Sequence, residues 1–442
     1  MWPFRTRKDS KPRTRNFEAA AGGRRWEGAG WLTNVNSSLA AGQSSIRARA
    51  QHASLNNPHA ARAASAWVAN VVGIGIRPQS AAGAAVDEVV AAWAAECDAA
   101  GRCDLYGMQS AVVRSVFVAG EAFIRFRTRR PEDGLVIPIQ LEILDPQQVD
   151  AAMHKDLGAG GRIISGIEFD PLGRRVAYHV SRHAPGDPLG STQLEPSRVP
   201  AEDILHIFES LVPGQVRGIS RFAPVLLRLR DLDELADAAL MKAKIESMFA
   251  GFLTDADGSM LEGAADASVL TQGLEPGTLR ILPPGSDIKF SNPTAGGETF
   301  APFVSTQLHA IAAGLGLTYE QVSGDMAGVN YSSARVALIE FRRMVEAFRA
   351  HVLRPQFLDP VWRRVLAIAE LAGAVPVGVD QGCRWIAPAW EWVDPLKDVE
   401  ADARAVEAGF KSRRQIRTEW GFDPDQVEAE IAAERPAVEP TA

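Results

Sequence analysis

The sequence is poor in cysteine, and its few thiols form no recognisable metal or redox motif. Three cysteines, Cys97, Cys103 and Cys383, occur in 442 residues. The spacing of Cys97 and Cys103 fits neither a zinc knuckle nor a CxxC redox pair. An odd and sparse set of this kind predicts structural thiols in a reducing compartment.

Long apolar stretches are also missing. No window approaches the roughly 20 uninterrupted apolar residues that a membrane-spanning helix needs. The first residues, Met1-Trp2-Pro3-Phe4-Arg5, lack the apolar run of a signal peptide. The sequence therefore predicts a protein that is made and used in the cytoplasm and has no membrane partner.

The chain has no surplus of positive charge. Its 47 Lys and Arg residues stand against 54 Asp and Glu residues, and the formal net charge is -7. A protein that grips nucleic acid by neutralising phosphates usually carries a basic surplus. This balance argues against strong general DNA binding, although it does not exclude DNA passing close to the protein.

Common catalytic motifs are absent as well. The sequence contains no GxxxxGK[ST] phosphate loop, no GxSxG and no HExxH. The glycine-rich stretch 158–161 has no helical pattern after it and predicts a turn. His179 and His183 lie on a predicted strand and turn, which does not favour a metal site. We therefore predict no catalytic residue, no metal and no cofactor.

Composition and periodicity favour an α+β fold with more than one substructure. The chain is too long for a single compact core. Residues 46–72 have a helical pattern that breaks at Asn57-Pro58, where Asn57 is a predicted helix cap. Further helices are predicted from Val86 through Trp93 and from Leu105 to Ala119. A mixed antiparallel sheet is predicted from strands at 122–127, 137–144, 163–169, 176–180 and 204–208.

Long helices dominate the second half. A glycine-free amphipathic helix is predicted from Ser220 to about Phe249, and its acidic residues can mimic a Mg²⁺ cluster or form a solvated or channel-facing surface. Another helix is predicted from Thr299 to Gly316, followed by a loop. A long helix from Ser332 to about Ala372 is expected to bend near its prolines. Two short helices, 398–409 and 412–434, are predicted near the end.

Four segments resemble the lambda-like family of phage portal proteins. The strongest is YEQVSGDMAGVNYSSAR, from Tyr319 to Arg335, which continues to Glu340-Phe341-Arg342-Arg343. The others are Arg47 to Pro58 with Asn70 to Ile76, Cys103 through Phe123, and Trp392 to Lys397 with Gly409 and Gly421-Phe422-Asp423-Pro424. The matches follow the order of that family over residues 17 to about 435.

The resemblance implies a portal fold that assembles as a ring of twelve subunits at one capsid vertex. The implied parts are a flexible basic N-terminal arm (1–30), an α/β wing (31–218), stem helix 1 (219–250), a small β-containing clip (251–297), stem helix 2 (298–317), a tunnel loop (318–331), a long wing helix (332–375), a helical crown (376–435) and a tail (436–442). The segment 251–297 is the part least like the family.

The resemblance also suggests where the protein contacts DNA and its own copies. The expected tunnel-loop residues are Gly324, Asp325, Met326, Gly328, Val329, Asn330 and Tyr331. The expected stem residues that face the channel are Asp231, Asp233, Glu234 and Asp237, with solvent or neighbouring subunits as the alternative. The expected intersubunit residues are Arg335, Glu340, Arg342 and Arg343.

The implied function is packaging and ejection of a phage genome through a non-enzymatic channel in the virion. Its expected partners are further copies of itself, the terminase large subunit, capsid or scaffold protein, head–tail adaptor proteins and double-stranded DNA without sequence specificity. Two alternatives remain open on the sequence. One is a polymer-acting enzyme of a mobile element, such as a nuclease or protease, and the other is a non-viral scaffold protein.

Overall fold

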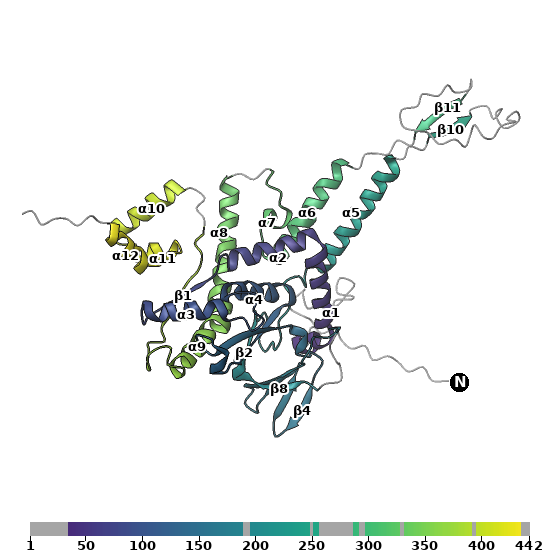
Figure 1. Ribbon diagram of the computed structural model, residues 1–442. Coiled ribbons are helices and arrows are strands. Elements are labelled where there is room, and N and C mark those ends of the chain that lie inside the picture. Colours follow the sequence, from purple (N-terminus) through teal and green to yellow (C-terminus); the bar gives the residue numbers. More distant parts are fainter. Residues whose placement is uncertain are drawn as a thin grey trace, which may run out of the picture.

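The protein consists of an α/β body, a helical stalk that projects from it and a small helical unit near the C-terminal end (Figure 1). In the computed structural model the described residues are 34–188, 195–247, 251–255, 286–290, 297–327, 331–390 and 395–434. The predicted arm (1–30) and tail (436–442) lie outside them. The combination of helices and antiparallel sheets confirms the predicted α+β class.

Four helices form one layer of the body: α1 (Val35–Asn56), α2 (Pro58–Val71), α3 (Ala84–Glu96) and α4 (Leu105–Ala119). The predicted break between α1 and α2 is confirmed. Asn57 caps α2, because its Oδ1 accepts a 2.9 Å hydrogen bond from the backbone N–H of Ala60. Pro58 lies in the first turn, where a backbone N–H has no partner within the helix, so the N–H that proline lacks breaks no hydrogen bond.

Two antiparallel sheets lie beside this layer, where the sequence predicted one mixed sheet. The first has the strand order β3-β2-β9 and contains β2 (Glu121–Thr128), β3 (Ile139–Leu144) and β9 (Ile204–Phe208). The second has the order β4-β5-β6-β7-β8 and contains β4 (Lys155–Gly158), β5 (Gly161–Ile164), β6 (Ile167–Phe169), β7 (Arg175–Val180) and β8 (Ser197–Pro200). Short 3₁₀ turns occur at Pro131–Asp133, Pro146–Gln148 and Ala201–Asp203.

The predicted strand 163–169 is in fact a hairpin. Ser165 and Gly166 have φ angles of 51° and 77°, a left-handed conformation that reverses the chain between β5 and β6. The Ser165-Gly166 dipeptide is a common turn signal, and it separates the two short apolar runs that the prediction had joined into one strand. The predicted turn at 158–161 is confirmed by positive φ angles at Gly158, Ala159 and Gly160.

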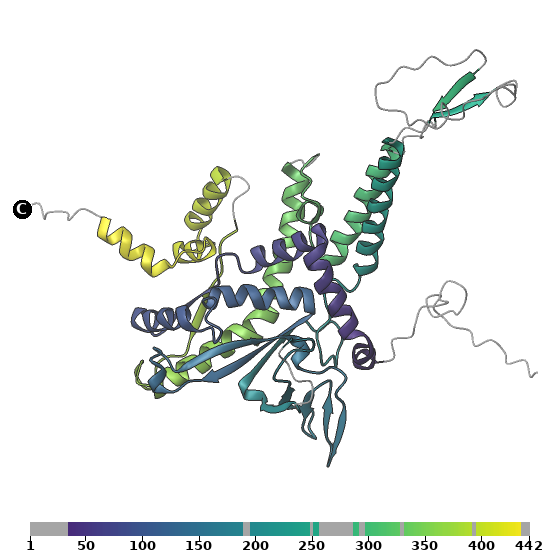
Figure 2. The same ribbon diagram turned by 45° about the vertical axis from the view of Figure 1, so that its right-hand side comes forward.

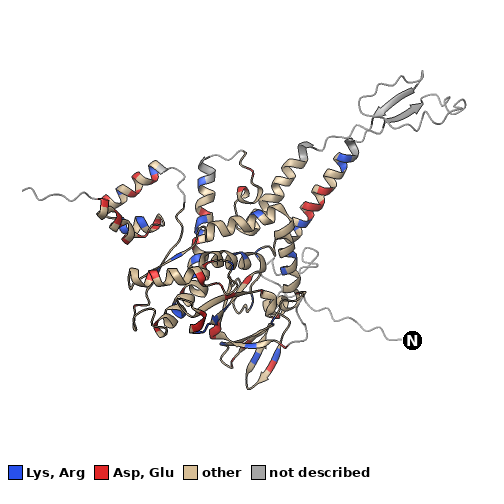
Figure 3. Ribbon diagram, viewed as in Figure 1, with Lys and Arg blue, Asp and Glu red and all other residues tan. Residues whose placement is uncertain are grey.

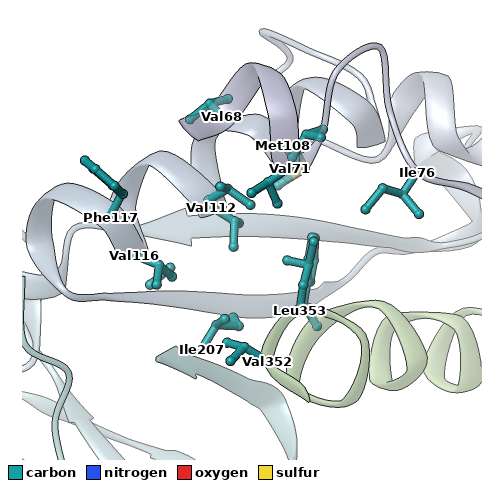
Figure 4. Close-up of a cluster of buried hydrophobic side chains, with 14 of the residues drawn as sticks. Val68, Val71, Ile76, Met108, Val112, Val116, Phe117, Ile207, Val352 and Leu353 are labelled. Atoms are coloured by element: carbon teal, nitrogen blue, oxygen red, sulfur yellow. The ribbon is translucent and has the colours of Figure 1, made fainter. Parts of the chain in front are cut away.

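The main core lies on both faces of the β3-β2-β9 sheet. Helices α2 and α4 cover one face through residues such as Val71, Met108 and Val112, and Figure 4 shows Ile207 of β9 facing Val352 on the other side. Among the bulkiest buried side chains is Trp67, whose ring lies 5.8 Å from that of Phe117. These contacts make the body a rigid base for the elements that project from it.

The stalk is a pair of helices with a β-hairpin beyond its far end. Helices α5 (Leu226–Ser247) and α6 (Gly297–Leu315) lie side by side in both views, and strands β10 (Gly251–Asp255) and β11 (Ser286–Phe290) pair beyond them (Figures 1 and 2). Helix α5 begins later than the predicted Ser220. Ala223 precedes Pro224, and a residue before proline disfavours helical geometry, so residues 221–225 form turns.

A long interrupted helix returns from the stalk region across the body. Helix α7 (Tyr319–Ser323) is short, and α8 (Tyr331–Phe348) continues into a π-helix η8 (Arg349–Leu358) and then α9 (Asp359–Leu371). The π-helix contains Pro355, which lacks an amide hydrogen for the α-helical ladder. The helix is not broken at Pro355 or Pro360; it changes to π-helical geometry around Pro355 and continues through both prolines.

The last part of the described chain contains three helices where two were predicted. Strand β12 (Cys383–Ile386) pairs with β1 (Arg77–Ser80), and helices α10 (Pro395–Glu407), α11 (Arg413–Glu419) and α12 (Pro424–Glu434) follow. Gly421 has a φ of 75° and separates α11 from α12, which explains why 412–434 is not one helix. These helices lie on the side of the body away from the stalk (Figure 2).

Candidate functional site

The described charge of the stalk is concentrated on α5. Asp231, Glu234 and Asp237 are exposed and follow one another at intervals of three residues, which places them on one broad side of the helix. Helix α6 carries no Asp, Glu, Lys or Arg between Phe300 and Leu315, and Figure 3 shows the contrast between the two helices. The stalk therefore has one helix rich in charges of both signs beside a helix that carries no charge over residues 300–315.

Asp233 has a different environment from the other three carboxylates. It is half-buried, and its Oδ1 accepts a hydrogen bond of 2.7 Å from Nδ2 of Asn57, the residue that caps α2. Its carboxylate is therefore directed to the body of the same chain. Glu234 forms an ion pair with Arg230, one turn earlier, in which Arg230 Nε lies 2.7 Å from Glu234 Oε1, and both side chains are largely exposed. A pair of this kind contributes little to stability.

The predicted tunnel loop is only partly loop. Helix α7 occupies Tyr319–Ser323, and Gly324, with a φ of 75°, ends it in a left-handed conformation. Asp325 and Met326 follow, and Met326 is 70% exposed. Tyr331 is the first residue of α8, whereas Gly328, Val329 and Asn330 lie outside the described residues. The loop thus starts from a fixed helical turn that packs on the body.

Two of the four residues predicted at subunit contacts interact within the chain. Arg335 Nη2 lies 3.7 Å from Asp398 Oδ1 of α10, and the Arg342 guanidinium lies 5.2 Å from the ring centre of Trp390. Glu340 and Arg343 are exposed on α8. The role of all four at subunit contacts stays a prediction.

A buried ionic cluster at the centre of the body was not predicted. Glu121 at the start of β2 is fully buried, and Arg217 binds it with Nε and Nη2 at 2.9 and 2.6 Å. Arg47 of α1 reaches the same carboxylate at 2.6 Å, and His206 of β9 lies 2.9 Å from it. Arg217 also donates to the carbonyl oxygen of Ser165 at 2.7 Å. One carboxylate therefore joins α1, both sheets and the segment before the stalk.

The charges in this cluster have shifted pKa values. Burial alone raises the pKa of Glu121, but the Arg217 guanidinium and the hydrogen bonds from His206 and Arg217 outweigh it, so the pKa lies well below its usual value. Burial lowers the pKa of His206 to about 4, although Glu121 opposes that change. His206 is therefore neutral near pH 7, and its Nε2–H donates to the carboxylate.

Close packing of the backbone accompanies the cluster. Gly120 has a φ of 93°, and a Cβ atom there would lie 2.5 Å from the carbonyl carbon of Ile219. A Cβ atom on Gly218 would overlap the carbonyl oxygen of Gly120. Glycine is needed at both positions because two chain segments cross without room for a side chain. The signal available in the sequence was a charged Glu121 that follows a glycine and directly precedes the apolar run 122–124.

The sequence of this chain matches a known family over most of its length. Residues 23–349 match the description "Phage portal protein, lambda family". The chain belongs to this family of phage portal proteins. The family is one of structural proteins, and the resemblance noted in the sequence is confirmed.

Two curated portal proteins illustrate the relationship. A probable portal protein of Halomonas phage phiHAP-1 is 27% identical over 448 residues, which cover 95% of this chain and 86% of the relative. Portal protein B of Escherichia phage lambda is 24% identical over 351 residues, which cover 71% of this chain and 65% of that relative. The chain thus spans just under two thirds of the lambda protein.

Solved structures show the same fold. A chain in the neck of an empty GTA particle, computed with C6 symmetry, is 18% identical, with a TM-score of 0.50 and coverage of 84% of this chain and 91% of that one. A chain in the neck of a native GTA particle, computed with C12 symmetry, has the same identity and TM-score, with coverage of 89% and 95%. The overall fold is therefore shared at low sequence identity.

No part of the described portal chain is arranged as a metal centre. Within the described ranges, no group of three or more His, Cys, Asp or Glu side chains could hold a metal ion. Among the helices in these ranges, none has the length and apolar character needed to cross a membrane. An open groove of about 680 Å³ lies between the turn at 219–224, the end of α6 and α8, and Glu209 and Arg221 pair across 2.8 Å at its edge.

The neutral state of His206 gives the portal protein a predictable response to acid. Because the folded pKa of about 4 lies below the ordinary value of 6.5, the unfolded state binds the proton more tightly. This contribution to stability is fully present above pH 6.5 and is lost as the pH falls toward 4. A difference of about 2.5 pKa units corresponds to roughly 3 kcal/mol.

Urea unfolding at several pH values tests this expectation. The free energy of unfolding should fall between pH 6.5 and 4, and His206→Gln should flatten that fall, because glutamine keeps an N–H donor but does not titrate in this range. An equally steep fall in the variant would assign the acid sensitivity to other groups.

Proposed function

We propose that this portal protein forms a closed ring of identical subunits, twelve in the particle, around a central channel for double-stranded DNA. The observation that carries the proposal is the stalk, a helix pair that projects from the body and leaves its sides open. Leu227 on α5 is 76% exposed and Phe303 on α6 is 50% exposed, an arrangement that suits neighbours on both sides. The C12 symmetry used for the similar GTA neck supports the subunit number.

The elements suggest how the parts divide the work. The body, residues 31–218 with the long helix 332–375, is the wing that contacts neighbouring subunits and the capsid or scaffold protein. Helices α5 and α6 are the stem, and the hairpin β10–β11 belongs to a clip within 251–297. The clip is the proposed docking surface for the terminase and later for adaptor proteins. Helices α10–α12 form the crown.

The charge distribution fits a conduit through which DNA slides. Each Lys or Arg that pairs with a phosphate releases counterions and tightens binding, so a channel for moving DNA should offer few such contacts. Exposed Asp231, Glu234 and Asp237, repeated around a ring, would keep DNA centred by repulsion. The segment after Gly324, with exposed Met326, is the proposed tunnel loop.

The protein is proposed to act without chemistry of its own, in the virion, after assembly in the bacterial cytoplasm. A separate terminase ATPase would supply the energy for packaging, since the sequence contains no phosphate-binding loop. The family match favours this channel function over a polymer-acting enzyme or a non-viral scaffold.

Electron microscopy tests the ring directly. The full chain, expressed alone and together with its capsid protein, should give rings with a central hole, and particles should carry one ring at a single vertex. A protein that stays monomeric under both conditions would overturn the proposal. A nuclease or protease activity of the purified chain would overturn its non-enzymatic part.

A further inference from the structure

The first turns of α2 contact the stalk through one buried side chain. Asn57 is only 4% exposed, and its Oδ1 accepts the amide of Ala60, which caps the helix. Its Nδ2 donates to Asp233 of α5 at 2.7 Å. Both ends of the Asn57 amide are therefore used, one for the helix and one for the stalk.

The same end of α2 also supports α7. His59 Nδ1 lies 3.3 Å from the carbonyl oxygen of Val322, and Arg62 donates to the carbonyl oxygen of Glu320 at 3.4 Å. Arg62 also lies against Gly324, where a Cβ atom would be 3.3 Å from its Cζ. Val322 itself is fully buried in the main core. Helix α7 and the loop after it are thus positioned by residues within two turns of Asn57.

Helix α6 holds the segment from the other side. The ring of Tyr319 stacks on that of His309, with centres 4.1 Å apart and an angle of 11° between the planes. The Tyr319 hydroxyl lies 3.4 Å from Asp325 Oδ2, just beyond the end of α7. Residues 319–327 therefore lie between the stalk and α2, and a shift of either would displace them.

We propose that Asn57 and Asp233 form a joint that fixes the stalk on the body, and that the shared α2 turn makes the position of residues 319–327 depend on this joint. Asp233 is then a positioning residue and not a channel-facing one. In a ring whose clip docks the terminase and whose loop faces DNA, the joint would transmit a change of stalk angle to the loop. That consequence rests on the proposed function, whereas the joint itself does not.

A reciprocal exchange tests the joint. Asn57→Asp keeps the helix cap, because aspartate caps as well as asparagine, but it places two carboxylates against each other. Adding Asp233→Asn restores a donor and an acceptor with the roles reversed. Hydrogen–deuterium exchange of amides in 229–237 and 319–327 should be faster in Asn57→Asp by roughly tenfold, equal to about 1.4 kcal/mol, and should return toward wild type in the double variant.

Matched variants separate the joint from general loosening. Asp231→Asn, two positions before Asp233 and therefore on a different face of the same helix, should not restore exchange in Asn57→Asp. Asp233→Ala serves as a second variant in case Asn57→Asp folds poorly. It removes the acceptor without placing two carboxylates together, so exchange should be faster in the same two segments but by a smaller factor. Faster exchange in 229–237 alone would overturn the coupling, and no change in either segment would overturn the joint. Faster exchange in both segments that is not reversed by adding Asp233→Asn would also overturn the joint.

Because exchange is measured on the chain itself, this test is independent of ring formation and DNA packaging. If the exchange data confirm the joint but the wild-type chain forms no ring, the inference stands and the proposed function is refuted. Rings that package DNA normally, with exchange in 319–327 insensitive to Asn57→Asp, would refute the inference alone.

Discussion

Glu121→Gln is expected to destabilise the body by roughly 3–5 kcal/mol, because it leaves the buried guanidinium groups of Arg47 and Arg217 without a counter-charge. A buried ion pair adds little over an apolar replacement, but removing one partner leaves an uncompensated charge in a medium of low polarity. The loss should be large for this site because the carboxylate joins α1, both sheets and the segment that leads to the stalk.

Denaturant unfolding of the full chain measures the effect, with Glu142→Gln as the matched control. Glu142 pairs with Arg127 at 2.6 Å in the same sheet, but both side chains are about one-third exposed. Its loss should cost at most about 1 kcal/mol. If the two variants lose the same free energy of unfolding, the buried cluster stabilises the body no more than the partly exposed pair does.

Reversing the charge of the stalk is expected to slow DNA packaging at least about tenfold. Replacing Asp231, Glu234 and Asp237 together by Lys would place cations around the proposed channel, where each phosphate contact strengthens binding and must be broken again as DNA moves. The variant rings should retain duplex DNA more tightly at low salt, and the retention should weaken steeply as salt is raised.

Packaging rate and salt-dependent DNA retention by purified rings are the two measurements. The matched control replaces Glu407, Glu430 and Glu434 by Lys, because these exposed residues lie on α10 and α12, on the side of the body away from the stalk. Equal slowing in both sets would point to overall charge and not to the stalk. An unchanged packaging rate in the stalk set would show that these carboxylates do not face DNA.

Local signals in the sequence were sufficient for the helices whose ends are set by neighbouring residues. The joint between α1 and α2 at Asn57-Pro58 was predicted because a cap and a proline act within one turn. Helix α4 was predicted with its observed bounds, and the structure shows a side-chain cap from Asp104 at its start and a left-handed Gly120 at its end. In these segments the sequence within a few positions determines the backbone.

Features set by distant contacts could not be predicted in this way. Asp233 looked like its acidic neighbours on α5, but its hydrogen-bond donor is 176 positions earlier in the chain. The cluster around Glu121 collects residues from four separate segments, and none of them carries a motif. The hairpin at Ser165-Gly166 is a different case, because a Ser-Gly dipeptide between two short apolar runs is a local turn signal that the prediction of one continuous strand overlooked.

The arrangement of the stalk also affects how the portal can change in evolution. The chain leaves the body through α5 and returns through the adjacent α6, so the two ends that carry β10 and β11 stay close together. Adding or deleting residues between Asp255 and Ser286 is therefore expected to leave the positions of both helices unchanged. A surface built there is free to diverge with whatever it contacts, while the cluster at Glu121 continues to fix the base from which the stalk projects.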